Sequence, residues 1–437
     1  MTVKPFHLGW FLNGTSVPAW GQPFSGAIGT QWQSAEIFVD LARAMERACF
    51  DYVLIEDNTF VGDRYGDSME VYLKHAFQAP RQDPMIVATL LAQATSKLGI
   101  IPTAGSFAYH PYMLARLVGS LDQLSKGRMG VNLVTGTSDR ALQNYGYPGM
   151  GEHDSRYDTA EDFINASLAL WDTWEPDAVV ADVHTGVWAD HTKVHRADFE
   201  SATYSTRGPL NSGPLPQGRP IISQAGGSPR GIAFAAKYAD TVIAIQATPA
   251  KMKEYRDKVR EAAVSFGRNP DDVKVLFGIW PTIGSSQSEA DDRIAAARAG
   301  VAANLEVALA AMAKSTDIDF ANVPLDVPLG ELGLSTNGTQ QFAEFSARNA
   351  TLTLREATIA RSGAAGPALA GTPDHVAGLM EDIMAEVGGD GFLIGTNGVT
   401  RRFIAEITDG LVPELQRRGL TRRGYSFDQL RDNLLEF

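Results

Sequence analysis

The sequence predicts an α/β fold in which eight strands and eight helices alternate and close into a (β/α)8 barrel. Eight short apolar runs of strand length lie along the chain, and stretches with helical periodicity lie between them. Eight strands, each followed by a helix, are the number that a TIM barrel contains. A doubly wound open sheet also alternates strands and helices. The number of units favours the barrel.

The apolar runs expected to form strands come in this order: 6–12, 52–57, 98–104, 129–135, 220–225, 241–246, 273–283 and 391–396. The helical periodicities cover residues 34–49, 84–96, 111–125, 155–174, 229–238, 249–266, 286–314 and 400–418. No internal repeat, low-complexity tract or flexible linker interrupts this alternation. Residues 1–437 are therefore expected to form a single domain with insertions.

Four long connecting stretches are the expected insertions: 58–83, 137–152, 175–219 and 315–371. Most βα loops have two to six residues, and longer ones are usually functional. Insertions after strands gather over the C-terminal face of a barrel, where active sites lie. The stretch 175–219 follows a helix and is rich in Asp, His, Gly and Pro, so we expect an ordered excursion of the same domain.

The composition excludes several classes of protein. The chain is 44% hydrophobic and 20% charged, and no apolar run approaches the roughly 20 residues of a membrane span. The N-terminus lacks the features of a signal peptide, so a cytoplasmic protein is expected. A net charge of −13 argues against a nucleic-acid partner. The basic tract 417–424 is expected to be a solvated turn.

No metal site is expected, because Cys49 is the one cysteine and no set of ligands has metal-binding spacing. The strand ends, where a barrel places its active-site residues, are instead polar and small, with Asp57, Thr103 and Asn132 among them. They contain no carboxylate pair, no Ser-His-Asp order and no Schiff-base lysine. No catalytic side chain is assigned.

The segment QAGGSPRG after the fifth run predicts an anion site. Gly226 and Gly227 allow a tight turn, Ser228 caps the next helix, and Pro229 fits its first turn. The free N–H groups at this helix start attract a phosphate. An ordinary helix cap is an equally good interpretation. The chain contains no G-x-G-x-x-G motif and no P-loop, so nothing indicates a domain for NAD(P)H or ATP.

The segment GEHDSRYDTAEDF opens the predicted helix 155–174. Ser155 and Asp158 have the spacing of a capping box, which predicts a helix from about residue 155. His153 and Tyr157, four residues apart, are expected to face one side of its N-terminus and to hold a phosphate with Ser228. Packing of Tyr157 in the core is the alternative. Arg156 either balances the phosphate charge or pairs with a neighbouring acid.

Three runs in the same order, LDQLSKGRMGVNLVTGTSDRALQNYG (121–146), EHDSRYDTAEDF and QAGGSPRG, resemble the bacterial-luciferase-like flavin monooxygenases. The resemblance covers most of the chain. Within this family, the chain resembles most the branch of nitrilotriacetate, dibenzothiophene-sulfone, dimethyl-sulfide and long-chain alkane monooxygenases. The resemblance implies a barrel with insertions, reduced FMN (FMNH2) as cofactor, O2 as co-substrate and a separate NAD(P)H:flavin reductase. It also implies a homodimer or homotetramer.

The resemblance also implies roles for single residues. Asp57 and Thr103 match strand ends that contact the flavin, and Asn132 matches an asparagine beside it. The ribityl chain and phosphate would be held by His153, Tyr157, Ser228 and the backbone of Gly227. The family run usually ends in VTS, whereas here Gly136 follows Val-Thr. Residues 14–33 also depart from the family, so the substrate is not inherited.

The function expected from this resemblance is the insertion of one oxygen atom from O2 into a small organic substrate by way of a flavin peroxide. Stretches 58–83 and 315–371 would act as lids, and the candidate walls of the pocket are Trp10, Phe107, Tyr109 and Trp280. Gln78 is a weaker candidate for a substrate contact. The alternatives are a deazaflavin-dependent oxidoreductase of the same superfamily and a non-catalytic flavin-binding protein.

Overall fold

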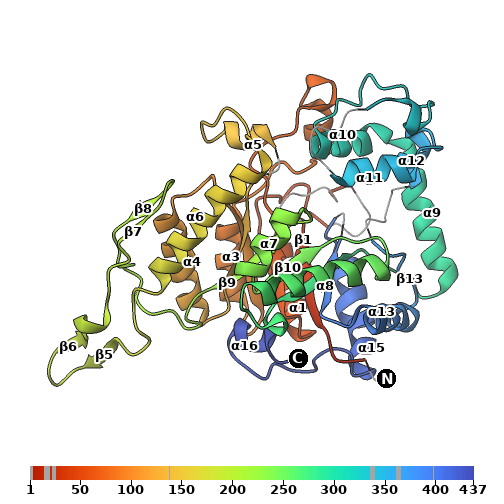
Figure 1. Ribbon diagram of the computed structural model, residues 1–437. Helices are drawn as coiled ribbons and strands as arrows, with labels where there is room; N and C mark the ends of the chain where they lie inside the picture. Colours follow the sequence, from red (N-terminus) through yellow and green to blue (C-terminus); the bar gives the residue numbers. More distant parts are fainter. Residues whose placement is uncertain are drawn as a thin grey trace.

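The computed structural model describes residues 3–13, 20–21, 26–136, 138–334, 340–360, 366–396 and 398–437. Its centre is a closed barrel of parallel strands in the order β1-β14-β11-β10-β9-β4-β3-β2 (Figure 1). The barrel strands are β1 (His7–Leu12), β2 (Tyr52–Ile55), β3 (Gly99–Gly105), β4 (Gly130–Val134), β9 (Ile221–Ala225), β10 (Thr241–Ala244), β11 (Lys274–Ile279) and β14 (Gly391–Gly395). Each predicted apolar run overlaps one of them, with β3 ending one residue beyond the predicted 98–104, and the barrel is confirmed.

Side chains fill the interior of the barrel. Tyr52, Ile101, Ile243 and Leu393 belong to one buried cluster, to which six of the eight strands contribute. The hydroxyl group of Tyr52 in β2 lies 3.0 Å from that of Thr241 in β10. This buried polar pair spans the barrel, which is a packed core and not a pore.

The helices around the barrel begin in a repeated way. They are α1 (Glu36–Arg47), α3 (Pro84–Ala94), α4 (Pro111–Ser125), α6 (His153–Trp171), α7 (Pro229–Tyr238), α8 (Pro249–Ser265), α13 (Pro373–Val387) and the continuous run α14 (Arg401–Ala405), η5 (Glu406–Leu411) and α15 (Val412–Arg417). Five of them, α3, α4, α7, α8 and α13, start at a proline whose preceding residue caps the first turn. Proline suits this position because its missing N–H is not needed there.

The seventh strand–helix unit differs from the prediction. Stretch 286–314 forms α9 (Gln287–Ala303) and α10 (Leu305–Thr316), bent by 82°, and both belong to an insertion. The barrel helix after β11 is α13, which packs against α8 and was not predicted. The run 273–283 also divides: β11 ends at Ile279, and β12 (Thr282–Ile283) pairs with β13 (Ala370–Gly371) outside the barrel. The insertion therefore begins about 30 residues before the predicted 315.

The insertions after strands lie together over one end of the barrel (Figure 1). They contain η1 (Tyr65–Asp67), α2 (Glu70–Lys74), α5 (Asp139–Gln143), α10, η4 (Leu329–Glu331), α11 (Gln340–Arg348) and α12 (Leu354–Ala360). The Tyr72 hydroxyl donates to the Ala310 carbonyl over 3.0 Å. Arg140 pairs with Asp63 and, at 3.0 Å, with Asp317. These contacts join the insertions that follow β2, β4 and β11.

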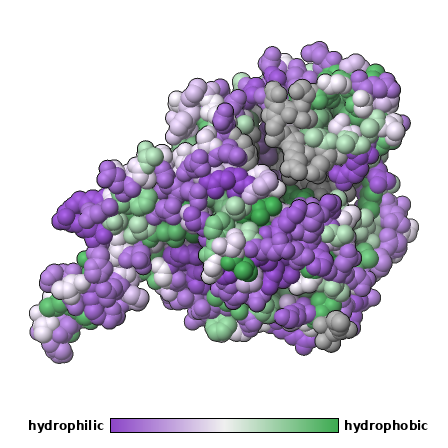
Figure 2. Space-filling model, viewed as in Figure 1, coloured by the Kyte–Doolittle hydropathy of each residue, from purple (hydrophilic) through white to green (hydrophobic). Residues whose placement is uncertain are grey.

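The stretch 175–219 leaves the barrel elsewhere. It carries β5 (Val179–Asp182), β6 (Val187–Ala189), η2 (His191–Lys193), β7 (Phe199–Glu200) and β8 (Ser205–Thr206). These elements form an arm on the left of Figure 1, with β5 and β6 at its lower end. Figure 2 shows hydrophobic residues on this arm, where Val183 and Trp188 are exposed. The arm is thus an ordered excursion, and it lies away from the insertions that cover the strand ends.

The basic tract 417–424 is not a solvated turn. The Arg422 side chain is 4% exposed and donates to Asp51 over 2.7 Å and to Glu436 over 2.8 Å. Nδ1 of His7 lies 2.9 Å from the same Asp51 carboxylate. Burial raises the pKa of Asp51, but His7 and Arg422 outweigh it and hold that pKa below its usual range. This charged group joins the C-terminal segment around α16 (Leu430–Leu434) to β1.

Within the described ranges, no single helix is long and apolar enough to cross a membrane. Helices α9 and α10 pass that test only as a bent pair. The same residues contain no group of three or more His, Cys, Asp or Glu side chains placed to hold a metal ion.

Candidate active site at the ends of the barrel strands

Strands β3, β4 and β9 carry a row of neighbouring polar side chains, within two residues of the last residue of each strand. Thr103, Asn132 and Ser223 lie opposite one another in the strand register. Nδ2 of Asn132 donates to Oγ1 of Thr103 over 3.0 Å. Oδ1 of Asn132 and Oγ of Ser223 are buried and have no hydrogen-bond partner among the described residues. Buried polar atoms are rarely left unpaired, so the missing partners of these two need an explanation, and a bound ligand would supply one.

Asp57 follows the end of β2 and is partly buried. Burial raises the pKa of its carboxyl group to about 6, and the nearby Arg81 opposes this shift. Near neutral pH a fraction of Asp57 is therefore protonated and can donate a hydrogen bond or give up a proton. The structure thus places Asp57, Thr103 and Asn132 at the ends of three consecutive strands, β2, β3 and β4.

Ser228 caps helix α7, as the sequence predicts. Its Oγ accepts from the Gly231 N–H over 3.0 Å. A Cβ atom added at Gly227 would meet nothing within 4 Å, so the space beside this turn is open. The helix start and its free N–H groups can accommodate an anion.

Tyr157 meets the same turn from helix α6. Its ring packs against Phe234 at 5.7 Å, and the residue is 5% exposed. A Cβ atom added at Gly231 would lie 2.7 Å from the Tyr157 hydroxyl, so glycine is needed for this approach. Burial raises the pKa of Tyr157, and hydrogen bonding to Gln224 and Ser228 opposes the shift. The ring serves the core, as the alternative interpretation proposed, while the hydroxyl reaches the Ser228 turn.

The predicted capping box is wrong. Helix α6 begins at His153 with Glu152 as its N-cap, and the Ser155 hydroxyl donates to the Glu152 carbonyl over 2.9 Å. Asp158 instead accepts from Arg230 over 2.8 Å, which ties α6 to α7. His153 supplies the first turn of backbone, and its side chain lies outside the described residues.

Among the described residues Arg156 forms no ion pair with an acid, which was one of the two roles considered for it. It donates to the Gly136 carbonyl over 2.9 Å and lies 3.4 Å from the Met150 sulfur. It therefore fixes the loop after β4. Gly136 has a φ of 95°, which favours glycine, and an added Cβ would lie 2.7 Å from Leu142. This conformation explains why glycine follows Val-Thr in this chain.

The predicted walls of the pocket have different surroundings. Trp10 is fully buried, at 0% exposure, between Phe50 and Phe403, so it belongs to the core. Phe107 lies beside the strand ends and packs edge-to-face on Tyr145 at 5.4 Å. The Gln78 side chain has a buried Oε1 without a partner among the described residues.

Two cationic side chains above the strand ends, Arg81 and Lys314, were not identified by the sequence analysis. Arg81 donates from Nη1 to Glu56 over 2.8 Å, and its side chain is 6% exposed. Its Nε and Nη2 are buried and have no partner in the described part of the chain. The Lys314 ammonium lies over the Phe60 ring, 5.3 Å from its centre. Burial lowers the pKa of Lys314 to about 8, although Glu56 and Asp57 oppose the shift.

We expect Lys314→Met to stabilise the protein by about 2 kcal/mol at neutral pH, because it removes a desolvated ammonium. The pKa of Lys314 is lower in the folded chain, so its cost is complete below about 8 and is relieved as the pH rises towards 10.5. Urea unfolding across this pH range should show the gain and its decline. Lys74→Met, at an exposed lysine paired with Glu306, is the control. Equal stability of both variants would contradict the prediction.

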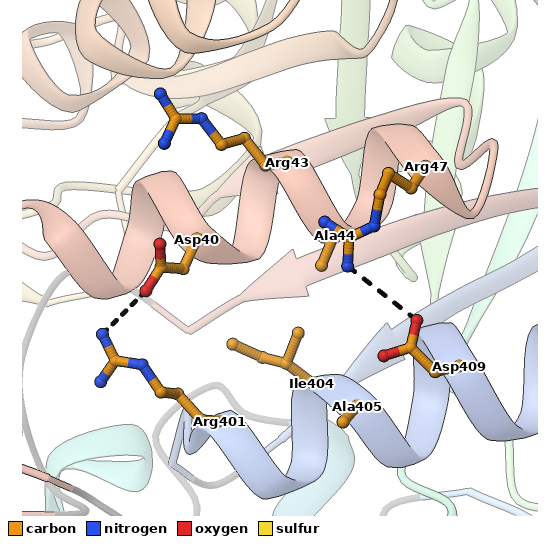
Figure 3. Close-up of a pocket in the computed structure, with 8 residues that line it drawn as sticks. All are labelled: Asp40, Arg43, Ala44, Arg47, Arg401, Ile404, Ala405 and Asp409. Atoms are coloured by element: carbon orange, nitrogen blue, oxygen red, sulfur yellow. Dashed lines mark hydrogen bonds and ion pairs between the residues drawn. The ribbon is translucent and has the colours of Figure 1, made fainter.

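A groove on the outer ring is a separate feature. It lies between α1 and α14, has a volume of 290 Å³, and is bordered by two ion pairs (Figure 3). Asp40 accepts from Arg401 over 2.7 Å, and Asp409 lies 3.9 Å from Arg47. The groove is formed by helices that surround the barrel, and none of the polar strand-end residues borders it.

Comparison with known proteins identifies the class to which this barrel and its strand-end site belong. The family model for luciferase-like monooxygenases matches residues 14–391, and the chain belongs to this family. It is 33% identical to the dibenzothiophene-sulfone monooxygenase of Rhodococcus erythropolis (strain XP), over 99% of this chain and 96% of that protein. It is 31% identical to nitrilotriacetate monooxygenase component A of Aminobacter aminovorans, over 99% and 96% of the two chains.

Solved structures of other proteins share the fold of this chain. A riboflavin lyase crystallised with modified FMN and riboflavin superposes with a TM-score of 0.86 at 30% identity, covering 99% of this chain and 96% of that one. An F420-dependent secondary alcohol dehydrogenase is 17% identical, with a TM-score of 0.58 over 94% and 99% of the two chains. That more distant likeness concerns the fold alone.

Proposed function

We propose that the protein is an FMNH2-dependent monooxygenase that transfers one oxygen atom from O2 to a small organic substrate. The observation that carries this proposal is the pairing of an anion-binding turn with unpartnered buried polar atoms along the same strand ends. Ser228 and Tyr157 form the first part. Oδ1 of Asn132 and Oγ of Ser223 form the second. A flavin mononucleotide has both a phosphate and a polar ring edge to match them.

The residues present fit reduced FMN. The phosphate would lie at the start of α7, held by Ser228, Tyr157, His153 and the backbone of Gly227. Asp57, Thr103 and Asn132 would contact the ring system. When bound, reduced FMN supplies the reaction with O2, and the protein supplies position and a dry pocket.

We assign two further roles, one to Asp57 and one to the insertions that cover the strand ends. The Asp57 carboxyl, with a pKa of about 6, can hold a proton at Oδ near the ring or release it. The joined insertions after β2, β4 and β11 lie over the strand ends and would keep water from them. Water exclusion strengthens each hydrogen bond made inside.

A separate NAD(P)H:flavin reductase would deliver the cofactor. This proposal is supported by the missing nucleotide-binding motifs and by a relative named as component A of its enzyme. We further propose that the chain assembles as a homodimer or homotetramer. Among other functions, deazaflavin-dependent hydride transfer has only the distant fold likeness in its favour.

A reductase-coupled assay under isotopically labelled O2 tests the proposal. Organic sulfides, sulfones, alkanes and aminocarboxylates would be offered with FMN, reductase and NAD(P)H. We expect at least one product to gain a single labelled oxygen atom, in an amount that depends on FMN. FMN binding without labelled product from any compound would favour the non-catalytic alternative. Turnover that requires a deazaflavin would favour hydride transfer.

A further inference from the structure

We propose that the substrate carries an anionic group, of the carboxylate type, which binds to Arg81 and Lys314 above the end of β2. This inference rests on the proposed function and deepens it by naming a class of substrate. The first residue belongs to the insertion after β2, and the second belongs to α10 in the insertion after β11. The two lids would thus each supply one cation to the same ligand.

The free edge of Arg81 has the geometry of a carboxylate site. Nη1 is occupied by Glu56, whereas Nε and Nη2 have no partner among the described residues. These two nitrogens form the edge of a guanidinium that binds both oxygens of a carboxylate. Elsewhere in this protein, Arg256 uses the same edge to bind Asp390 at 3.1 and 2.9 Å. Arg355 uses it to bind Asp326 at 2.8 and 3.1 Å.

The ammonium of Lys314 is a second cation in the same place. In the described part of the chain it has no hydrogen bond and no ion pair, and it lies over the Phe60 ring, 5.3 Å from the ring centre. Its charge interacts with Glu56, Asp57 and Arg81, so these four groups form one cluster. A buried ammonium without a partner costs stability. An anionic ligand would offset that cost.

The acids of the cluster leave the free edge of Arg81 unused. Glu56 is bound by Nη1 of Arg81 over 2.8 Å. Asp57 forms no ion pair with either cation among the described residues, and all four groups are at least partly buried. An anionic ligand therefore has no competitor within the cluster for Nε and Nη2 of Arg81.

The place of the cluster separates it from the phosphate of FMN. The Ser228 turn follows β9, whereas Glu56 and Asp57 follow β2, three strands away in the barrel order. Between them lie Thr103 and Asn132, which would contact the flavin ring. An anionic group at Arg81 would therefore anchor a substrate beside the ring end of the flavin, away from the phosphate.

The test compares acids with neutral amides of the same shape. A series of methylthio-substituted alkanoates and their amides would be titrated calorimetrically into the protein with and without oxidised FMN. We expect at least one acid to bind about tenfold more tightly than its amide. Arg81→Met should abolish this preference. Lys314→Met, which breaks no ion pair, should reduce it and keeps the test valid if the Arg81 variant fails to fold.

The control is Arg355→Met, an exposed arginine whose edge is already filled, which should leave the ratio unchanged. Equal binding of acid and amide throughout the series would overturn the inference. So would variants that weaken FMN binding and leave the ratio of acid to amide unaltered, because the cations would then serve the flavin. FMN affinity, measured separately by fluorescence, reports on the proposed function. Its absence contradicts that function whatever the ratio shows.

Discussion

Replacing Tyr157 with phenylalanine and Ser228 with alanine in one chain is expected to weaken FMN binding about a hundredfold. Each change removes a hydroxyl group that we assign to the phosphate end of the cofactor. The phosphate is charged, and hydrogen bonds to a charged group are stronger than those between neutral groups. Quenching of FMN fluorescence on titration with protein would measure the dissociation constant.

The serine change also removes the cap of α7, which is worth about 1 kcal/mol. Thr248→Ala is the matched control, because Thr248 caps the next barrel helix, α8, by accepting from the Lys251 N–H. It should lower stability to a similar extent and leave FMN binding unchanged. If the double variant binds FMN as tightly as the original chain, the phosphate does not lie at this turn.

Arg422→Met should lower the free energy of unfolding by about 3–5 kcal/mol. The variant leaves the Asp51 carboxylate buried with one cation fewer, and His7 alone does not replace the two-sided pairing. Removing one partner of a buried pair costs more than the pair contributes, because the remaining charge is uncompensated. Urea unfolding near neutral pH would measure the loss.

Arg423→Met tests the neighbouring exposed arginine and should change stability by about 0.5 kcal/mol or less. The effect of Arg422→Met should also depend on pH. The lowered pKa of Asp51 means that its stabilising contribution is complete above the ordinary value and is lost as the pH falls through the folded value. The difference between the variant and the original chain should therefore shrink in acid. A difference that grows in acid would contradict this account.

The barrel could be predicted because its strands are continuous apolar runs, and their number specifies the architecture. The helix that follows β11 could not be predicted. Helical periodicity predicts a helix at 286–314 and none at 373–387, and it does not show which segment covers β11. Packing decides: α13 lies against α8, while α10 joins the insertions through Tyr72 and Ala310.

In the candidate site, too, some residues could be predicted from the sequence and others could not. The Ser228 turn could be predicted because its cap, proline and glycines are neighbours in the sequence. Arg81, Lys314 and Arg422 could not, since their roles depend on distant partners. Arg422 and Asp51 are 371 residues apart. Local rules treat an arginine or lysine as a surface residue, and only the folded chain shows that these are buried.

Rapid mixing of the protein–FMNH2 complex with oxygenated buffer is the most direct test of the proposed function. We expect that reduced FMN binds and that its oxidation passes through a spectral species distinct from both reduced and oxidised FMN. This species should persist longer than any seen with free FMNH2, because the pocket excludes water. Oxidation in one phase at the rate of free FMNH2, together with no measurable FMNH2 affinity, would contradict the account.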